Sequence, residues 1–168
     1  ALLKKDPAAQ IVCYGGDEMK AAGGKLLSHY KESAFMGFYE VFKNLRVIKK
    51  KLNTCKKELL AFHPDAVIFI DYPGFNLRMA AFAKRQGLRT IYYISPKIWA
   101  WNKGRIKEIR SFVDKLLVIF PFEVPFYKSL NYPVEYVGNP LIEHIDSYEL
   151  DISFKRSENH RWNIAFLP

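Results

Sequence analysis

The sequence predicts an α/β fold in which helices cover a parallel sheet on both faces. Short β-branched and aromatic runs alternate along the chain with longer helical patterns, and several runs end at Gly or Asp. This alternation is typical of βαβ units, whose crossovers are right-handed. The 168 residues suffice for one domain with a hydrophobic core, and a hydrophobic content of 49% excludes a disordered chain.

The elements follow in order. Residues 1–7 are typical of the last turn of a helix that runs into a loop. Apolar runs predict strands at residues 10–14, 66–70, 90–94, 115–120 and 134–137. Helices are predicted between them at residues 45–62, 75–86, 103–111 and 123–130.

The helix at 45–62 is predicted by spacing. Its apolar residues recur every three or four positions and share one face, and most lysines fall on the other: the apolar residues are Leu45, Ile48, Leu52, Cys55, Leu59 and Phe62. His63 precedes Pro64 and should end this helix, because a residue before proline avoids the α region. Gly87 is a suitable C-cap for the next helix.

The domain organisation is predicted from composition. Residues 1–145 form the main α/β domain, and the polar, poorly periodic residues 146–161 form a linker. Residues 162–168 begin a strand of a second domain. Because the chain lacks an initiating Met and this strand stops at Pro168, we expect a fragment of a longer protein.

The charge balance points to an anionic partner. The chain has 26 Lys and Arg against 17 Asp and Glu, a net charge of +9. This favours nucleic acid, an acidic membrane surface or a phosphorylated substrate without choosing among them. No apolar run approaches the roughly 20 residues of a membrane-spanning helix.

Asp71 directly follows a buried strand, so it is placed at the carboxyl edge, where ligands bind in open α/β sheets. There it could accept a proton or hold a sugar hydroxyl. The structural alternative is that Asp71 caps the helix that starts near Phe75. Asn76, five residues on, shares both interpretations.

Ser95, Trp99 and Trp101 follow the next strand and are candidates for substrate binding. The serine lacks a Gly-x-Ser-x-Gly setting, so it is not expected to be a nucleophile. The two indole rings could stack on a sugar or nucleobase, or could pack a strand-to-helix bend.

Glu123 and Asn139 are two further candidates for substrate binding. Glu123 lies in the first turn of a predicted helix, where a dipole-stabilised cap is the structural alternative. Asn139 follows the last strand, where a simple turn is the alternative. The four histidines lack metal-ligand spacing, so no metal and no cofactor are expected.

A dense aromatic cluster beside basic residues predicts a membrane-facing surface. Its members are Phe35, Phe38, Tyr39, Phe42, Lys43 and Arg46. The alternative is that the aromatic residues pack a small subdomain. Nucleic acid is not an expected partner, because no platform interleaves Lys and Arg with exposed aromatic residues and no RNA-binding motif occurs.

Six segments, in this order, resemble those of the lipid-A-disaccharide synthase family, and they span most of the chain. Two are specific: the Ser-Pro-x-x-Trp-Ala-Trp run of residues 95–101 and Pro-Phe-Glu at 121–123. The others are Gly-Asp-Glu-Met-Lys-Ala-Ala-Gly at 16–23, Met-Gly-Phe-Tyr-Glu-Val at 36–41, Ile-Asp-Tyr-Pro-Gly-Phe-Asn at 70–76 and Val-Gly-Asn-Pro at 137–140.

The resemblance implies the N-terminal, acceptor-side, Rossmann-like half of a two-domain glycosyltransferase of the GT-B type. The reaction it implies is inverting transfer of 2,3-diacylglucosamine from UDP to the 6-hydroxyl of 2,3-diacylglucosamine 1-phosphate. The products would be a β-1,6-linked disaccharide and UDP. Asp71 would be the general base or its orienting group.

The resemblance also implies a cytoplasmic enzyme that associates peripherally with the inner membrane, needs no metal and dimerises through its C-terminal domain. The chain departs from the commoner family pattern at Gly74, where an acidic residue is usual, and at Asn139, where His is usual. Two family motifs would lie beyond the ends of the chain, so this fragment alone is expected to be inactive. Two alternative functions remain. The protein could be another GT-B sugar-nucleotide glycosyltransferase or epimerase, or it could be a basic non-catalytic module that binds nucleic acid.

Overall fold

The computed structural model describes residues 2–30, 45–146 and 148–149, and the remaining residues are not discussed structurally. The chain divides into two compact units, Ala1–Pro64 and Asp65–Pro168, which are described separately. Within the described residues, no helix is long and apolar enough to cross a membrane.

The first unit contains a small parallel sheet and a long helix. Its elements are α1 (Leu2–Lys5), β1 (Val12–Gly15), α2 (Asp17–Ala21), β2 (Lys25–His29) and α4 (Leu45–Phe62). Strands β1 and β2 pair in parallel, with an irregularity between Cys13 and Tyr14. The turn into β2 passes through Gly23, whose φ of 96° is unfavourable for other residues.

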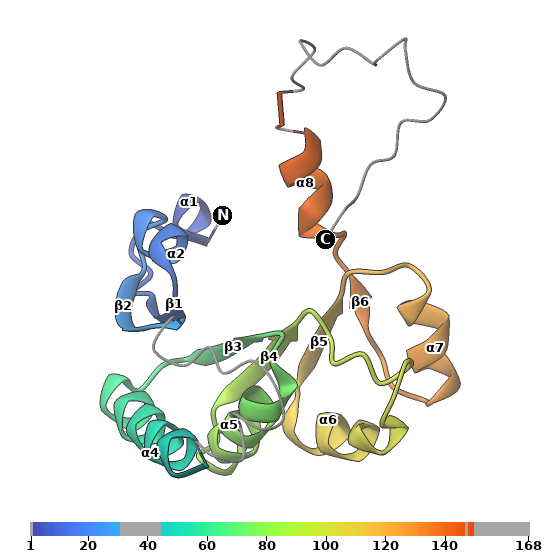
Figure 1. Ribbon diagram of the computed structural model, residues 1–168, viewed down its shortest axis with the longest axis horizontal. Coiled ribbons are helices and arrows are strands. Elements are labelled where there is room, and N and C mark those ends of the chain that lie inside the picture. The colour runs from blue at the N-terminus through green and yellow to red at the C-terminus, as the bar shows by residue number, and fades with distance from the viewer. Residues whose placement is uncertain (1, 31–44, 147, 150–168) are drawn as a thin grey trace, which may run out of the picture. The chain divides into compact units, whose positions relative to one another are not determined.

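The second unit carries the main sheet (Figure 1). Its elements are β3 (Ala66–Ile70), α5 (Pro73–Arg85), β4 (Arg89–Tyr93), the 3-10 helix η2 (Lys103–Arg105), α6 (Ile106–Phe112), β5 (Lys115–Val118), α7 (Glu123–Ser129), β6 (Glu135–Tyr136) and α8 (Pro140–Asp146). The strand order is β3-β4-β5-β6, and every neighbouring pair is parallel.

The strands of this sheet have one face packed against helices. In β3, Phe69 is buried while Ile68 and Ile70 are 45% and 38% exposed, so alternate residues point to opposite faces. Figure 1 shows α5 and α6 on the same side of the sheet. Because the strands follow chain order, right-handed crossovers place the connecting helices on that one face. In the described part of this unit, the expected helical cover on both faces of the sheet is therefore not observed.

The core of the second unit lies between the sheet and its helices. Tyr92 of β4 and Leu116 and Val118 of β5 are almost completely buried, as are Met79 of α5 and Ile109 of α6. Each such side chain contributes roughly 1.5–3 kcal/mol on leaving water. This packing fixes the strand ends from which the loops of the carboxyl edge emerge.

A polar cluster joins α5, β4 and β5 at the amino edge of the sheet. The Asp114 carboxylate accepts hydrogen bonds from the Thr90 amide (2.9 Å) and hydroxyl (3.1 Å), and it pairs with Lys84. The hydrogen bond from Lys84 is the main cause that lowers the pKa of Asp114. This cluster fixes the starts of two adjacent strands.

The sequence predictions of elements are largely confirmed. The helix at 45–62 and the strand at 66–70 have the predicted bounds, and the other strands of this sheet overlap their predictions. Three elements were not predicted, namely α2, β2 and α8. The linker at 147 and 150–161 and the strand at 162–168 lie outside the described residues.

Candidate active site

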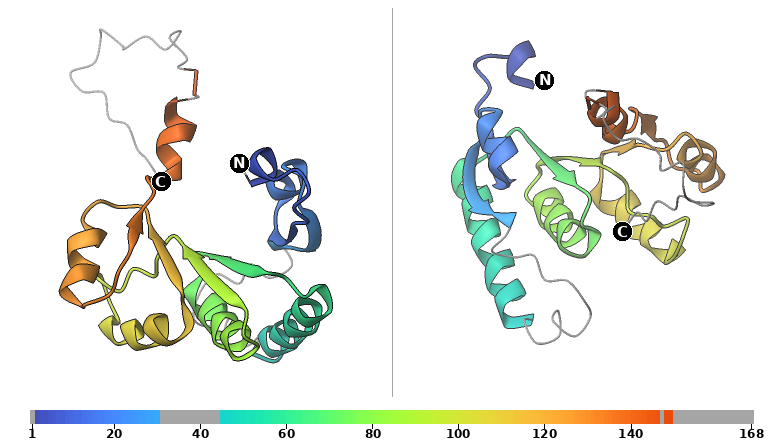
Figure 2. Two further views of the ribbon diagram at one scale, coloured as in Figure 1. Left: turned by 180° about the vertical axis from the view of Figure 1, so that it is seen from behind. Right: turned by 45° about the horizontal axis from the view of Figure 1, so that its top comes forward.

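The candidate site lies at the carboxyl edge of the main sheet. Strands β3, β4, β5 and β6 run in one direction, so the loops that follow them emerge at the same edge (Figure 2). Asp71 follows β3, Ser95 follows β4, Glu123 lies just beyond β5 and Asn139 follows β6. The topology thus brings together residues that lie up to 68 positions apart in the chain (139 − 71).

The backbone has positive φ angles at the residues that directly follow β3 and β4. Asp71 and Tyr72 have φ angles of 46° and 45°, and Ile94 has a φ of 62°. Such angles are unusual for a β-branched residue and require support from the surroundings. Two hydrogen bonds between neighbouring strands give part of it: the Asp71 amide to the Tyr93 carbonyl (3.0 Å) and the Ile94 amide to the Leu117 carbonyl (3.2 Å).

Two side chains hold the Asp71 turn. The Asn76 amide nitrogen donates to the carbonyls of Ile70 (3.0 Å) and Asp71 (2.7 Å), and the Tyr92 hydroxyl donates to the Asp71 carbonyl (2.6 Å). These bonds fix the backbone and leave the Asp71 side chain exposed. Among the described residues, no group donates a hydrogen bond to its carboxylate.

The structure does not support the alternative that Asp71 is a helix cap. The N-cap residue of α5 is Tyr72, in the left-handed region, and no side chain makes a capping hydrogen bond there. The Asp71 carboxylate is therefore not engaged in holding the helix.

Tyr92 is the buried support of this turn, with no exposed surface. Burial is the main cause that raises the pKa of Tyr92, the Asp71 carboxylate raises it further, and Arg105 opposes the shift. The hydroxyl consequently stays protonated and donates to Asp71 throughout the physiological range.

Ser95 and Glu123 form a buried pair that joins two loops. They are 3% and 1% exposed, and the Ser95 hydroxyl donates to Glu123 Oε1 over 2.5 Å. Glu123 Oε2 accepts the backbone amides of Ile119 (3.3 Å) and Phe120 (3.1 Å). A buried carboxylate needs such donors. The pair has almost no surface with which to touch a substrate, so direct contact, as predicted from the sequence, is not supported.

The two tryptophans have different surroundings. Trp99 packs edge to face on Phe122, with 5.0 Å between the ring centroids, which fits the packing interpretation. Trp101 is 59% exposed, and the guanidinium carbon of Arg105 lies 4.7 Å from the centroid of its ring. Trp101 is thus the more exposed of the two rings, and Trp99 is partly buried.

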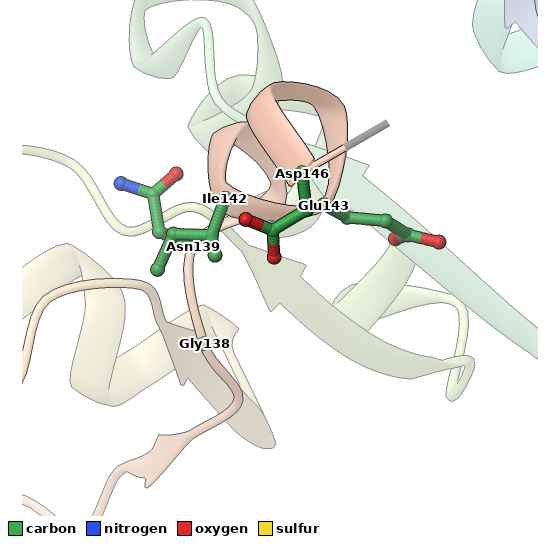
Figure 3. A pocket seen from close by; sticks show the side chains of 5 residues that line it. All are labelled: Gly138, Asn139, Ile142, Glu143 and Asp146. Carbon is green, nitrogen blue, oxygen red and sulfur yellow. The ribbon is translucent and has the colours of Figure 1, made fainter. Parts of the chain in front are cut away.

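Asn139 lies at the start of α8, beside an open hollow that it lines with Gly138, Ile142, Glu143 and Asp146 (Figure 3). Its Oδ1 accepts the amide of Leu141 over 3.0 Å, so it helps to begin the helix. The side-chain amide nitrogen has no described protein partner and can contact a ligand.

Most residues of the predicted membrane surface lie outside the part of the chain that the structure describes. Phe35, Phe38, Tyr39, Phe42 and Lys43 lie outside the described residues. Arg46 lies in α4 of the first unit and is exposed. Among the described residues, no group of three or more His, Cys, Asp or Glu side chains could hold a metal.

Sequence reasoning missed Tyr92 and Arg105. In the sequence, Tyr92 looks like an ordinary residue of an apolar strand. Its hydrogen bond to Asp71 joins residues 21 positions apart, and only the pairing of the two strands reveals it. Arg105 follows Trp101 by four residues, a spacing that brings side chains together on helices. That signal was available but weak, because Trp101 precedes the helical segment.

The fold and this edge define a Rossmann-like α/β protein, in which the carboxyl end of the parallel sheet is the usual ligand position. A family model described as lipid-A-disaccharide synthetase matches residues 1–168. The chain belongs to this family.

Relatives named lipid-A-disaccharide synthase agree with this assignment. The protein of Trichlorobacter lovleyi is 44% identical over 146 residues, which are 87% of this chain and 38% of the relative. That of Geobacter metallireducens is 42% identical over 156 residues, covering 93% of this chain and 39% of the relative. That of Coxiella burnetii is 41% identical, covering 84% and 38%. The chain therefore spans about two fifths of the length of these curated relatives.

Proposed function

We propose that the complete protein is a lipid-A-disaccharide synthase. It transfers 2,3-diacylglucosamine from its UDP derivative to 2,3-diacylglucosamine 1-phosphate, forming a β-1,6 bond and releasing UDP. Membership of the family and the names of the relatives support this activity. In this proposal the chain is the acceptor-side half of a GT-B enzyme, and a further C-terminal domain binds the UDP-sugar and mediates dimerisation.

The chemical step needs a base at the acceptor hydroxyl. As the acceptor oxygen attacks the anomeric carbon from the face opposite UDP, the bond from that carbon to the diphosphate breaks and the configuration inverts. The proton of the hydroxyl passes to the base. Asp71 is our candidate, because its carboxylate is exposed and unpartnered among the described residues, on a turn fixed by Asn76 and Tyr92.

The other candidate residues divide by their exposure. Trp101 and Asn139 have free polar or aromatic surface and are proposed to contact the substrates. Asn76, Ser95, Trp99 and Glu123 are proposed to shape the site by holding its loops, since their polar atoms or rings are engaged with the protein. A rigid scaffold of this kind keeps a base in position.

The test is Asp71→Asn in the complete protein, with both lipid substrates and product measured directly. Loss of the base should lower kcat at least about 100-fold while the thermal unfolding midpoint stays unchanged. Asp65→Asn is a matched control, because Asp65 is an exposed carboxylate at the opposite end of β3 and should leave turnover intact. Retained turnover in Asp71→Asn would remove Asp71 as base, whereas an inactive wild-type protein would refute the function.

We also propose that the complete protein acts in the cytoplasm at the inner membrane surface. Both proposed substrates carry acyl chains, and an apolar patch beside basic residues suits docking to an anionic leaflet. The sequence between residues 35 and 46 supplies such a patch.

A further inference from the structure

We propose that the guanidinium of Arg105, stacked on Trp101, binds the phosphate of the acceptor and orients that molecule at Asp71. This inference rests on the proposed function and deepens it, since it assigns a recognition group for one end of the acceptor. Nothing in the sequence motifs singled out Arg105.

Arg105 is a cation held in a defined position. It ends η2, it is partly buried, and its guanidinium carbon lies 4.7 Å from the centre of the Trp101 ring. Among the described residues, no carboxylate lies within ion-pair distance of Arg105, and none of its guanidinium nitrogens donates a hydrogen bond to protein. A partly buried guanidinium without such a partner gains free energy when a ligand supplies an anion.

Arg105 lies on the segment that follows β4, and Asp71 follows β3, the strand that pairs in parallel with β4. Tyr92 links the two, because its hydroxyl donates to the Asp71 carbonyl over 2.6 Å. The charges of Asp71 and Arg105 both act on this phenol, and they shift its pKa in opposite directions. Both charges therefore act on one buried side chain within the same unit.

Stacking prepares the guanidinium for a phosphate. The Trp101 ring holds the guanidinium carbon over its centre, and the N–H groups of a guanidinium match two phosphate oxygens. Trp101 is 59% exposed, so the stacked pair is open to solvent on the side away from the protein. The nearby Lys97 and Lys103 are exposed and have no such ring to fix them.

Of the two phosphate groups that Arg105 could bind, this geometry favours the phosphate of the acceptor. The acceptor presents a nucleophilic hydroxyl and a phosphate at opposite ends of one sugar ring. A base and a cation at one edge can hold both ends and so select which hydroxyl reacts. The donor diphosphate is the other source of the same chemistry, and the experiment below separates the two.

The test compares Arg105→Ala and Arg105→Lys with wild type in the complete protein. Kinetics are measured with diacylglucosamine 1-phosphate and with diacylglucosamine that lacks the phosphate. Arg105→Ala should lose roughly 10- to 100-fold in kcat/KM on the phosphorylated acceptor, mainly through a higher KM. On the unphosphorylated acceptor both proteins should be equally slow, and the KM for the UDP-sugar should not change. Arg105→Lys should recover only part of the loss.

The control is Lys107→Ala, which removes an exposed cation two residues away and should behave as wild type. Equal losses on both acceptors would show a merely structural role and overturn the proposal. A raised KM for the UDP-sugar alone would assign Arg105 to the donor diphosphate and also overturn it.

A direct measurement of acceptor binding tests the role of Arg105 independently of the proposed enzymatic function. The affinities of wild type and Arg105→Ala for short-chain diacylglucosamine 1-phosphate are measured by calorimetry without any donor. A roughly 10- to 100-fold weaker affinity of the variant would support phosphate binding even if turnover were absent. A loss of this size is what the removal of a hydrogen bond to a charged group is expected to cause. Equal affinities would overturn it even if the enzyme were active.

Discussion

Asp71, Tyr72 and Ile94 adopt positive φ angles that cost a residue of this kind roughly 1–2 kcal/mol each. Their strain is concentrated where β3 and β4 end, beside the exposed carboxylate. The support comes from hydrogen bonds donated by Asn76 and Tyr92 to the backbone and not to the Asp71 carboxylate. The turn is therefore held without engaging the carboxylate of Asp71.

Replacing Tyr92 with Phe tests this support. The change removes only the hydroxyl that donates to the Asp71 carbonyl, so it should lower stability by about 1 kcal/mol and kcat by roughly 3- to 10-fold, with little change in KM. The measurements are steady-state kinetics of the complete protein and its unfolding midpoint.

Tyr132→Phe is the matched control for this change. Tyr132 is also buried, with a pKa raised by burial to about 12, and its hydroxyl donates to the Val113 carbonyl over 2.9 Å. That carbonyl precedes β5, at the opposite edge of the sheet. The control should lose a similar amount of stability and no turnover. An equal fall of kcat in both variants would show that Tyr92 acts only through stability.

At the level of single residues, the sequence predicts where the candidate residues lie relative to the strands, and it does not predict their hydrogen-bond partners. Asp71 is placed by the strand that precedes it, which is a local pattern. The pairing of Ser95 with Glu123 depends on two loops from adjacent strands, and 28 residues separate the partners. No local pattern encodes that contact, so the sequence could not predict it.

Elements were predictable where local signals agree. The helix 45–62 ended as predicted, because His63 precedes a proline. Strand β2 was missed because its sequence, Lys-Leu-Leu-Ser-His, has no β-branched residue. Helix α8 was missed because a simple turn was the structural alternative at Asn139, although the proline that follows suits the first position of a helix.

The amino edge of the sheet gives a pH prediction. The pKa of Asp114 is lowered in the folded protein, so its stabilising effect is present above its unfolded pKa of about 4 and disappears as the pH falls through the folded value. Asp114→Asn should lower the free energy of unfolding by about 1 kcal/mol at pH 7, a modest value because the pair with Lys84 is partly exposed.

The measurement is the unfolding midpoint of both proteins between pH 7 and pH 3. The difference between wild type and Asp114→Asn should shrink as the pH falls. Glu108→Gln changes an exposed carboxylate of α6 and should leave the profile unaltered. A difference that is constant over this range would contradict the assigned role of the Asp114 charge.

Taken as a whole, the 168-residue chain carries a net charge of +9, which suits the proposed anionic leaflet. Replacing both Phe38 and Phe42 with Ser should weaken binding to anionic vesicles at least about tenfold without unfolding the protein. The reason is that the variant has less aromatic surface to insert into the membrane. Vesicle sedimentation at two salt concentrations measures it. Tyr148→Ser, at a 65% exposed aromatic residue elsewhere, is the control. Unchanged binding of the double variant would refute the membrane surface.

The order of the main sheet has a consequence for how the protein is made. Its strands lie in the order of synthesis, so each new strand can add to the edge left by the one before. Loop closures between neighbours are short, and chains emerge from the ribosome at about 5–20 residues per second. The Asp71 turn remains incomplete until β4 has been made, because both Tyr92 and Tyr93 contribute hydrogen bonds to it. The Asp71 turn is thus completed one strand behind the growing chain.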